Sequence, residues 1–161
     1  MKLIVAVSEN WGIGKDNDLL FAIPKDMKFF RETTVGKVVV LGRKNLETFP
    51  GMKPLPKRTN IIITRNPDYK CDGAIVVNSI EAVTELGYAD DELFVIGGEE
   101  IYRQMLKYCD ECFVTKVKEF AEADRFMVNL DEDDNWILAA ESEDIEDNGH
   151  IISFCRYERV R

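Results

Sequence analysis

The chain has 161 residues, of which 45% are hydrophobic and 32% charged, a composition typical of one globular domain spanning residues 1–161. Its formal net charge of −9 argues against binding to nucleic-acid phosphates or anionic membranes. No apolar run approaches the roughly 20 residues of a membrane-spanning helix, and the amino-terminal stretch lacks signal-peptide features, so we expect a cytoplasmic protein.

Short apolar, β-branched runs alternate with helical patterns, which predicts an α/β fold. We expect strands at residues 3–7, 37–41, 60–64, 74–77, 93–96, 112–117 and 151–157, with residues 136–140 pairing beside the last one. Uninterrupted apolar runs are typical of strands covered on both faces of a mostly parallel sheet. The last two strands have no helix between them and should be antiparallel.

Four helices are expected between these strands. The first covers residues 24–33 and has Pro24 at its first position. A short one covers 43–48, and a third opens at the capping sequence 78–81 and ends before Gly87. The fourth, at 99–108, has apolar residues along one stripe.

The cysteines do not predict a metal or redox centre. Cys109 and Cys112 have C-x-x-C spacing, but the chain has no second such pair, and its only histidine is His150. We therefore expect reduced thiols and no metal site.

Three strand ends could form an anion site. Gly97 and Gly98 join a buried strand to a helix, as in a phosphate-binding turn or a simple tight turn. Arg43 and Lys44 open another helix, where the helix dipole disfavours cations. With Arg65 they would form a basic cluster at the carboxyl edge of a parallel sheet, suited to a phosphate monoester. The alternative is that all three are solvated surface charges.

Asp26 is the candidate acid. It shares one helix face with Phe30 and Thr34, at four-residue spacing. It either stabilises the helix start or is a desolvated carboxyl that pairs with or protonates a heterocycle. In the rigid loop 54–58, Arg58 could reach an anionic substrate tail.

Taken in order, these residues resemble the dihydrofolate reductase family. The similarity runs from residue 1 to about 126, with a closing strand at 151–160, and no single motif carries it alone. The matching motifs are Val5-Ala6, Gly12-Ile-Gly14-Lys-Asp-Asn17, Ile23-Pro-Lys-Asp26-Met-Lys-Phe-Phe30, Thr34, Leu41-Gly-Arg43, Pro54-Leu-Pro-Lys-Arg58, Asn60-Ile-Ile, Val95-Ile-Gly-Gly-Glu-Glu-Ile-Tyr102, Thr115 and Asp124.

The resemblance implies a mostly parallel eight-stranded central sheet flanked by helices, with an antiparallel C-terminal strand. It implies NADPH as cofactor, dihydrofolate as substrate, a loop at about 8–21 that closes over the nicotinamide, and a monomer without an obligate protein partner. The implied cofactor-binding residues are Ala6, Ile13, Asn17, Gly42, Arg43, Lys44, Asn45, Thr64, Arg65, Ile96, Gly97, Gly98, Glu99, Glu100, Ile101 and Tyr102.

The family also implies a substrate side and a catalytic set. The implied substrate-binding residues are Ile4, Val5, Ala6, Asp26, Met27, Phe30, Leu55, Arg58, Ile96 and Thr115, and the implied catalytic residues are Asp26, Phe21, Thr115 and Tyr102. The chain departs from the family pattern at Leu20, Phe21, Asn45 and in the segment 125–128. These departures concern loop motion, cofactor affinity and substrate fit.

Two other functions remain open at this stage. A related reductase could act on another heterocycle, such as a pyrimidine of the riboflavin pathway, and the folate-side residues argue against it. A nucleotide-binding module without catalysis would use Asp26 only as a helix-start acid.

Overall fold

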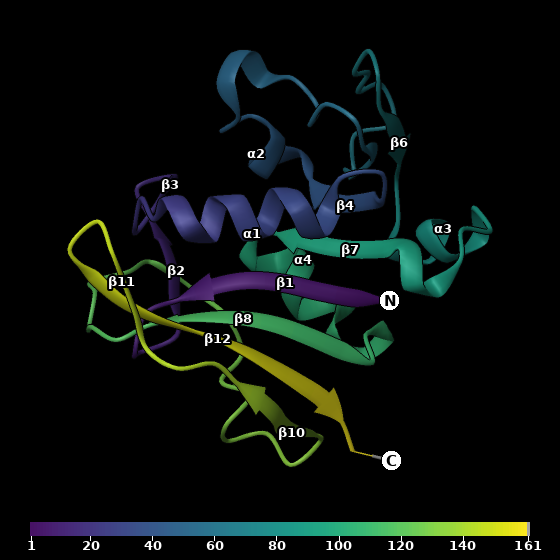
Figure 1. The fold of residues 1–161 in the computed structure, drawn as a ribbon. Helices are drawn as coiled ribbons and strands as arrows, with labels where there is room; N and C mark the ends of the chain where they lie inside the picture. The colour runs from purple at the N-terminus through teal and green to yellow at the C-terminus, as the bar shows by residue number, and fades with distance from the viewer. Residues whose placement is uncertain (161) are drawn as a thin grey trace.

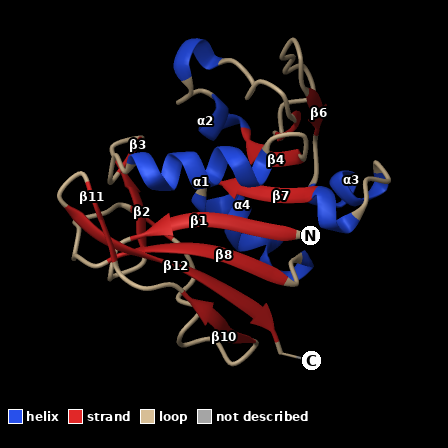
Figure 2. Ribbon diagram, viewed as in Figure 1, coloured by secondary structure: helices blue, strands red, loops and turns tan. Residues whose placement is uncertain are grey.

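The structure is a computed structural model that describes residues 1–160 as one large and one small β-sheet, with helices on both faces of the large sheet (Figures 1 and 2). The α-helices are α1 (Pro24–Thr34), α2 (Arg43–Leu46), α3 (Ile80–Glu85) and α4 (Glu99–Met105). The 3₁₀ segments are η1 (Pro50–Met52), η2 (Asp90–Glu92) and η3 (Leu106–Tyr108).

The large sheet follows the strand order β10-β12-β8-β1-β7-β4-β5-β6, and β11 pairs with β12. Its strands are β1 (Lys2–Val7), β4 (Val38–Gly42), β5 (Thr59–Ile63), β6 (Ile75–Val77), β7 (Leu93–Gly97), β8 (Glu111–Val117), β10 (Trp136–Glu141), β11 (Ile145–Asp147) and β12 (His150–Arg159). The pairs from β8 to β6 are parallel, whereas β12 is antiparallel to β8, β10 and β11. The predicted mostly parallel sheet is confirmed.

Successive residues of the central strands are buried on opposite faces of the sheet. Leu3 and Val5 belong to a core that includes residues of α3 and α4. Ile4, between them, belongs to a second core, against which Phe29 and Phe30 of α1 pack. Because both faces are covered, the strands are apolar without interruption.

The register brings three strand ends to one edge. Gly42 at the end of β4 lies opposite Ile63 of β5, and Leu41 lies opposite Gly97 at the end of β7. The segments that follow these strands therefore meet outside the carboxyl edge, the usual ligand-binding position in such sheets.

The small sheet was not predicted. It has the order β3-β2-β9 and consists of β2 (Gly12–Lys15), β3 (Asp18–Leu19) and β9 (Arg125–Phe126). Asp16 and Asn17 connect β2 to β3 with φ values of 52° and 64°, as in the two-residue turns of tight hairpins. These strands are short and carry little apolar alternation, so their pattern does not stand out in the sequence.

Several element boundaries differ from the expected ones, often by a single residue. The helix expected at 43–48 ends as an α-helix at Leu46. The helix expected at 99–108 changes from α to 3₁₀ geometry after Met105. The third strand begins one residue earlier than expected, at Thr59.

Candidate active site

A cavity of about 970 Å³ lies at the carboxyl edge of β4, β5 and β7. Ten of the predicted cofactor-binding residues line it, and they come from three separate segments: Gly42, Arg43, Lys44, Asn45, Thr64, Arg65, Gly98, Glu99, Glu100 and Ile101. Parallel strand pairing thus brings together residues that lie up to 59 positions apart, from 42 to 101.

The predicted basic cluster exists. Arg43, Lys44 and Arg65 line the same cavity, so they are not scattered over separate faces. Arg43 lies over the ring of Tyr69, 5.8 Å from its centroid, and its Nε is 3.8 Å from a carboxylate oxygen of Glu47. Because α2 has only one turn, its dipole is small, and the cationic side chains are the main attraction for an anion.

Gly97 and Gly98 differ in what surrounds them. A Cβ atom on Gly97, which has a φ of 118°, would lie 3.1 Å from the Tyr102 ring. A Cβ atom on Gly98 would meet no protein atom within 4 Å, and Gly98 lines the cavity. Gly97 is therefore required by the packing of α4, whereas Gly98 leaves room for a ligand to approach the backbone.

Neither acid at the start of α4 is a free charge. Glu99 accepts a hydrogen bond from the Phe126 N–H at 2.6 Å. Glu100 accepts hydrogen bonds from Arg103 at 3.0 Å and Gln104 at 2.7 Å. These contacts reduce the repulsion that the two carboxylates would exert on an anion in the cavity.

Asp26 lies in the first turn of α1 and is half-buried. The Thr115 hydroxyl on β8 donates to its Oδ1 at 2.6 Å. Burial raises the pKa of Asp26 above its ordinary value of 3.8, and the bond from Thr115 opposes that rise. The acid is therefore held in place, partly desolvated, and more readily protonated than an exposed aspartate.

Tyr102 connects α4 to the first strand. Its hydroxyl donates to the Ile4 carbonyl at 2.8 Å in the buried interior. Burial raises the pKa of Tyr102, with a further rise from the charge of Asp26. Ala6 lies opposite Thr115 in the register, so Asp26, Thr115, Ala6 and Tyr102 belong to neighbouring elements around β1 and β8.

The predicted substrate side gathers on the α1 face. Ile4, Ile96, Phe30 and Leu55 belong to one apolar cluster. The Arg58 guanidinium lies 5.8 Å from the Phe30 ring centroid, and its Nε donates to the Thr34 hydroxyl at 2.9 Å. Burial lowers the pKa of Arg58, and nearby Arg31 adds to this effect.

Other predicted residues lie apart from these groups. The Val5 and Ile13 side chains pack in the core on the opposite face of the sheet, and Met27 is 60% exposed. Asn17 lies in the β2–β3 turn. Phe21 packs with Ile23, Val117 and Ile152, and its ring lies edge-on to His150.

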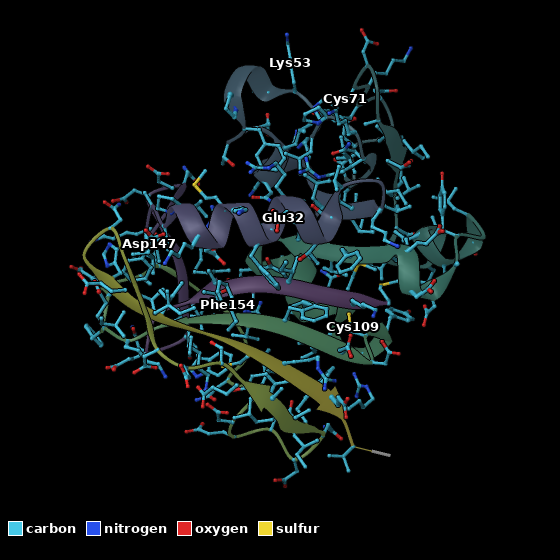
Figure 3. All side chains as sticks on the ribbon, viewed as in Figure 1. Glu32, Lys53, Cys71, Cys109, Asp147 and Phe154 are labelled. Atoms are coloured by element: carbon cyan, nitrogen blue, oxygen red, sulfur yellow. The ribbon has the colours of Figure 1, made fainter. Side chains whose placement is uncertain are left out.

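The segment around Phe21 is tied to the β11–β12 hairpin. The Asn148 side chain donates to the Ala22 carbonyl at 2.7 Å. The Lys25 N–H donates to Asp147 at 2.6 Å, and Figure 3 shows Asp147 near the start of α1. Phe154 of β12 packs against α1, with its ring centroid 4.9 Å from that of Phe29.

Sequence reasoning missed part of the cavity wall. The additional lining residues are Ile63, Asn66, Asn78, Ser79, Ile80, Glu81, Gln104 and Arg125. The sequence pattern at Asn78 and Ser79 predicts only a helix cap, and Ser79 does accept a hydrogen bond from the Ala82 N–H. Gln104 lies one helical turn after Glu100, so its four-residue spacing predicts that both side chains lie on the same face of the helix.

Two other features do not form competing sites. Cys109 and Cys112 are buried free thiols, and burial raises the pKa of Cys109 to about 12, which suppresses the reactive thiolate. A hollow of about 360 Å³ near Lys2 and Glu111 lies at the opposite end of the strands, and these two side chains pair with each other at 3.0 Å.

Within residues 1–160, no three His, Cys, Asp or Glu side chains are grouped as a metal site would require. No helix in that range is long and apolar enough to cross a membrane.

Comparison with known proteins points to one family. A family profile described as "Dihydrofolate reductase" matches residues 1–159. Dihydrofolate reductase of Bacillus subtilis is 35% identical over 161 residues, covering 99% of this chain and 94% of the relative. That of Staphylococcus haemolyticus is 37% identical, covering 100% and 96%.

A solved structure agrees with this result. It is dihydrofolate reductase from Enterococcus faecalis complexed with NADP(H) and RAB-propyl. It superposes with a TM-score of 0.87 at 31% sequence identity, covering 99% of this chain and 96% of that chain.

Proposed function

This chain belongs to the dihydrofolate reductase family, and from this premise we propose that it reduces dihydrofolate to tetrahydrofolate with NADPH. When bound, NADPH supplies the hydride that C6 of the pterin receives, while N5 gains a proton. We further propose that the enzyme is one domain over residues 1–161, acts in the cytoplasm as a monomer, and needs no obligate protein partner, nucleic acid or membrane.

The observation that carries the proposal is the meeting of Arg43, Lys44 and Arg65 in one cavity. On a protein with a net charge of −9, such a local cluster favours a ligand with several negative charges. The open space beside Gly98 allows a ligand phosphate to reach the backbone. These features fit NADPH, which carries a diphosphate and a 2′-phosphate.

In this assignment each cavity segment has a separate task. Arg43, Lys44 and Arg65, with Thr64, bind the 2′-phosphate through charge-assisted hydrogen bonds. Gly42, Asn45 and the turn at Gly97-Gly98 accommodate the diphosphate. The residues proposed to lie near the nicotinamide are Ala6, Ile13, Ile96 and Tyr102. Asn17, Glu99, Glu100 and Ile101 complete the proposed cofactor-binding set.

Asp26 is the proposed source of the proton for N5. Its raised pKa increases the protonated fraction near neutral pH, and the Thr115 hydroxyl fixes the carboxyl through its 2.6 Å bond. Phe30 stacks beside the pterin, Leu55 packs on the aryl part, and Arg58 binds the glutamate carboxylate. Ile4 shares the apolar cluster of Phe30 and Leu55. The other residues proposed for the substrate side and for catalysis are Val5, Met27 and Phe21, whose side chains lie outside that cluster.

The test is to mix the protein with NADPH and dihydrofolate and to follow the NADPH absorbance. We expect a steady fall in absorbance that requires both ligands, with tetrahydrofolate as product. A flat trace, although both ligands bind, would instead support a nucleotide-binding module without catalysis. Turnover of a pyrimidine of the riboflavin pathway, in place of dihydrofolate, would support the related reductase.

A further inference from the structure

Arg125 is a cation of the cofactor cavity to which the proposed function gives no task. It lies on β9 and lines the cavity together with Gly98 and Gln104. Its Nη2 donates to the Asn17 side-chain oxygen at 2.7 Å. Among residues 1–160 it makes no ion pair with a carboxylate, so most of the five guanidinium donors remain available to a ligand.

The position of Arg125 is fixed from two sides. On one side, β9 pairs with β2, and Arg125 lies opposite Gly14. On the other side, the N–H of the next residue, Phe126, donates to Glu99 at 2.6 Å. Because Glu99 directly follows Gly98, these contacts fix β9 next to the start of α4, and Arg125 and Gly98 line the same cavity.

Arg125 and Arg65 belong to different ends of the cavity. Gly98 follows β7, Arg65 follows β5, and β4 lies between these strands. Neighbouring strands are spaced roughly 4.8 Å apart, so two spacings separate the two ends. A ligand with two separate anionic groups matches this arrangement, with its terminal phosphate at the Arg65 end.

We propose that Arg125 contacts the diphosphate of bound NADPH and that Asn17 positions it, an inference that rests on the proposed cofactor. A guanidinium binds phosphate oxygens through two parallel hydrogen bonds. The Asn17 bond holds the side chain toward the cavity before the ligand arrives, which lowers the entropy lost on binding. Because Asn17 lies in the β2–β3 turn, bound cofactor in return stabilises that hairpin.

The test measures the dissociation constants of NADPH and NADH by fluorescence titration. The proteins compared are the wild type, Arg125→Gln, Arg125→Lys, Asn17→Ala and the double variant that combines Arg125→Gln with Asn17→Ala. Arg156→Gln is the control, because it removes the same charge on β12, outside the cavity lining. Losing a charge-assisted hydrogen bond should weaken binding roughly tenfold or more. Arg125→Gln should weaken NADPH and NADH equally, and Arg125→Lys should retain part of the affinity.

Asn17→Ala should weaken NADPH binding less than Arg125→Gln does. In the Arg125→Gln background, Asn17→Ala should have almost no further effect, because both changes remove the same interaction. Hydrogen exchange should show NADPH protecting Gly12–Leu19 in the wild type and much less in Arg125→Gln.

Each contrary outcome has a distinct meaning. If Arg125→Gln binds both nucleotides as tightly as Arg156→Gln does, the proposal is overturned. A loss confined to NADPH would place Arg125 at the 2′-phosphate and overturn the diphosphate assignment. Additive effects in the double variant would remove the positioning role of Asn17. A wild-type protein that binds no NADPH would contradict the proposed function itself.

Discussion

At the residue scale, the pairing of Asp26 with Thr115 links chemistry to stability. The carboxyl is half-buried and hydrogen-bonded from β8, so its position is fixed while its ionisation is made costly. The same burial that raises the pKa of Asp26 therefore works against folding when the group ionises.

The Asp26→Asn variant should bind NADPH normally but turn over roughly a hundredfold more slowly or worse at neutral pH, because a general acid contributes about that much. The deficit should shrink in acid, where solvent can protonate N5. Steady-state rates from about pH 5 to about pH 8 would check this, with NADPH titration as the binding control. An unchanged rate at neutral pH would remove Asp26 from the mechanism.

The same variant should unfold less readily than the wild type at neutral pH. A carboxyl whose pKa is raised on folding above 3.8 binds its proton more tightly in the folded chain. The free energy of unfolding therefore falls as pH rises from about that value through the folded-state pKa. The substituted amide cannot ionise, so the variant's advantage should disappear below pH 3.8. Urea titrations at neutral pH and below pH 3.8 measure the difference in the free energy of unfolding between the variant and the wild type. An equal difference at the two pH values would contradict this prediction.

Arg58→Ala should raise the KM for dihydrofolate roughly tenfold or more and leave kcat nearly unchanged, because it removes a binding contact remote from the reacting atoms. A pterin substrate without a glutamate tail should be unaffected. Lys57→Ala, at the exposed neighbouring position, is the matched control. If the KM rose equally for dihydrofolate and for the pterin without a tail, the cause would be the lost bond between Arg58 and Thr34. A lost contact with the substrate carboxylate would then be excluded.

At the element scale, the turn from β7 into α4 separates a folding requirement from a binding one. Gly97 approaches the Tyr102 ring closely with a positive φ, and Gly98 faces open space. The two glycines are adjacent in sequence and cannot be distinguished there. Only the packing of α4 against β7 assigns them different tasks.

Gly97→Ala should therefore destabilise the fold by about 1–3 kcal/mol, through a strained φ and a clash with Tyr102. Gly98→Ala should change stability little and weaken NADPH binding. Thermal unfolding without ligand and NADPH titration would distinguish the two. The assignment fails if Gly98→Ala is the more destabilising change.

Periodicity predicted the central strands and the main helices because those elements are long or wholly apolar. It missed the short β2–β3 hairpin. It also missed β9, which pairs with β2 through residues more than 100 positions apart, such as Gly14 and Arg125. The place of Arg125 in the cavity wall depends on that pairing and was missed with it. Arg43, Lys44 and Arg65 could be predicted because strand order alone brings strand ends together.

At the scale of the whole molecule, the acidic surface and the basic cavity have opposite effects on an anionic ligand. The net charge of −9 repels NADPH at long range, and that repulsion weakens with salt. The cations of the cavity act at contact distance. Ligand selectivity therefore depends on a few side chains and not on the overall charge.

NADPH at about 100 times its dissociation constant should stabilise the folded chain by about 2.7 kcal/mol and raise Tm by roughly 5–10 °C. NADH at the same concentration should raise Tm less, because it lacks the 2′-phosphate. In an Arg43→Gln, Arg65→Gln double variant the two nucleotides should give similar shifts. Differential scanning fluorimetry measures these values, and a full NADPH preference in that variant would contradict the assigned phosphate site.

The strand order also constrains how the protein is made. β12 is last in the sequence, yet it lies between β8 and β10 and pairs with both (Figure 1). While the chain is being synthesised, the edge of β8 that includes Thr115 stays open until residues 150–159 of β12 have left the ribosome. Until then, a nascent chain exposes a strand edge that chaperones or neighbouring chains can bind.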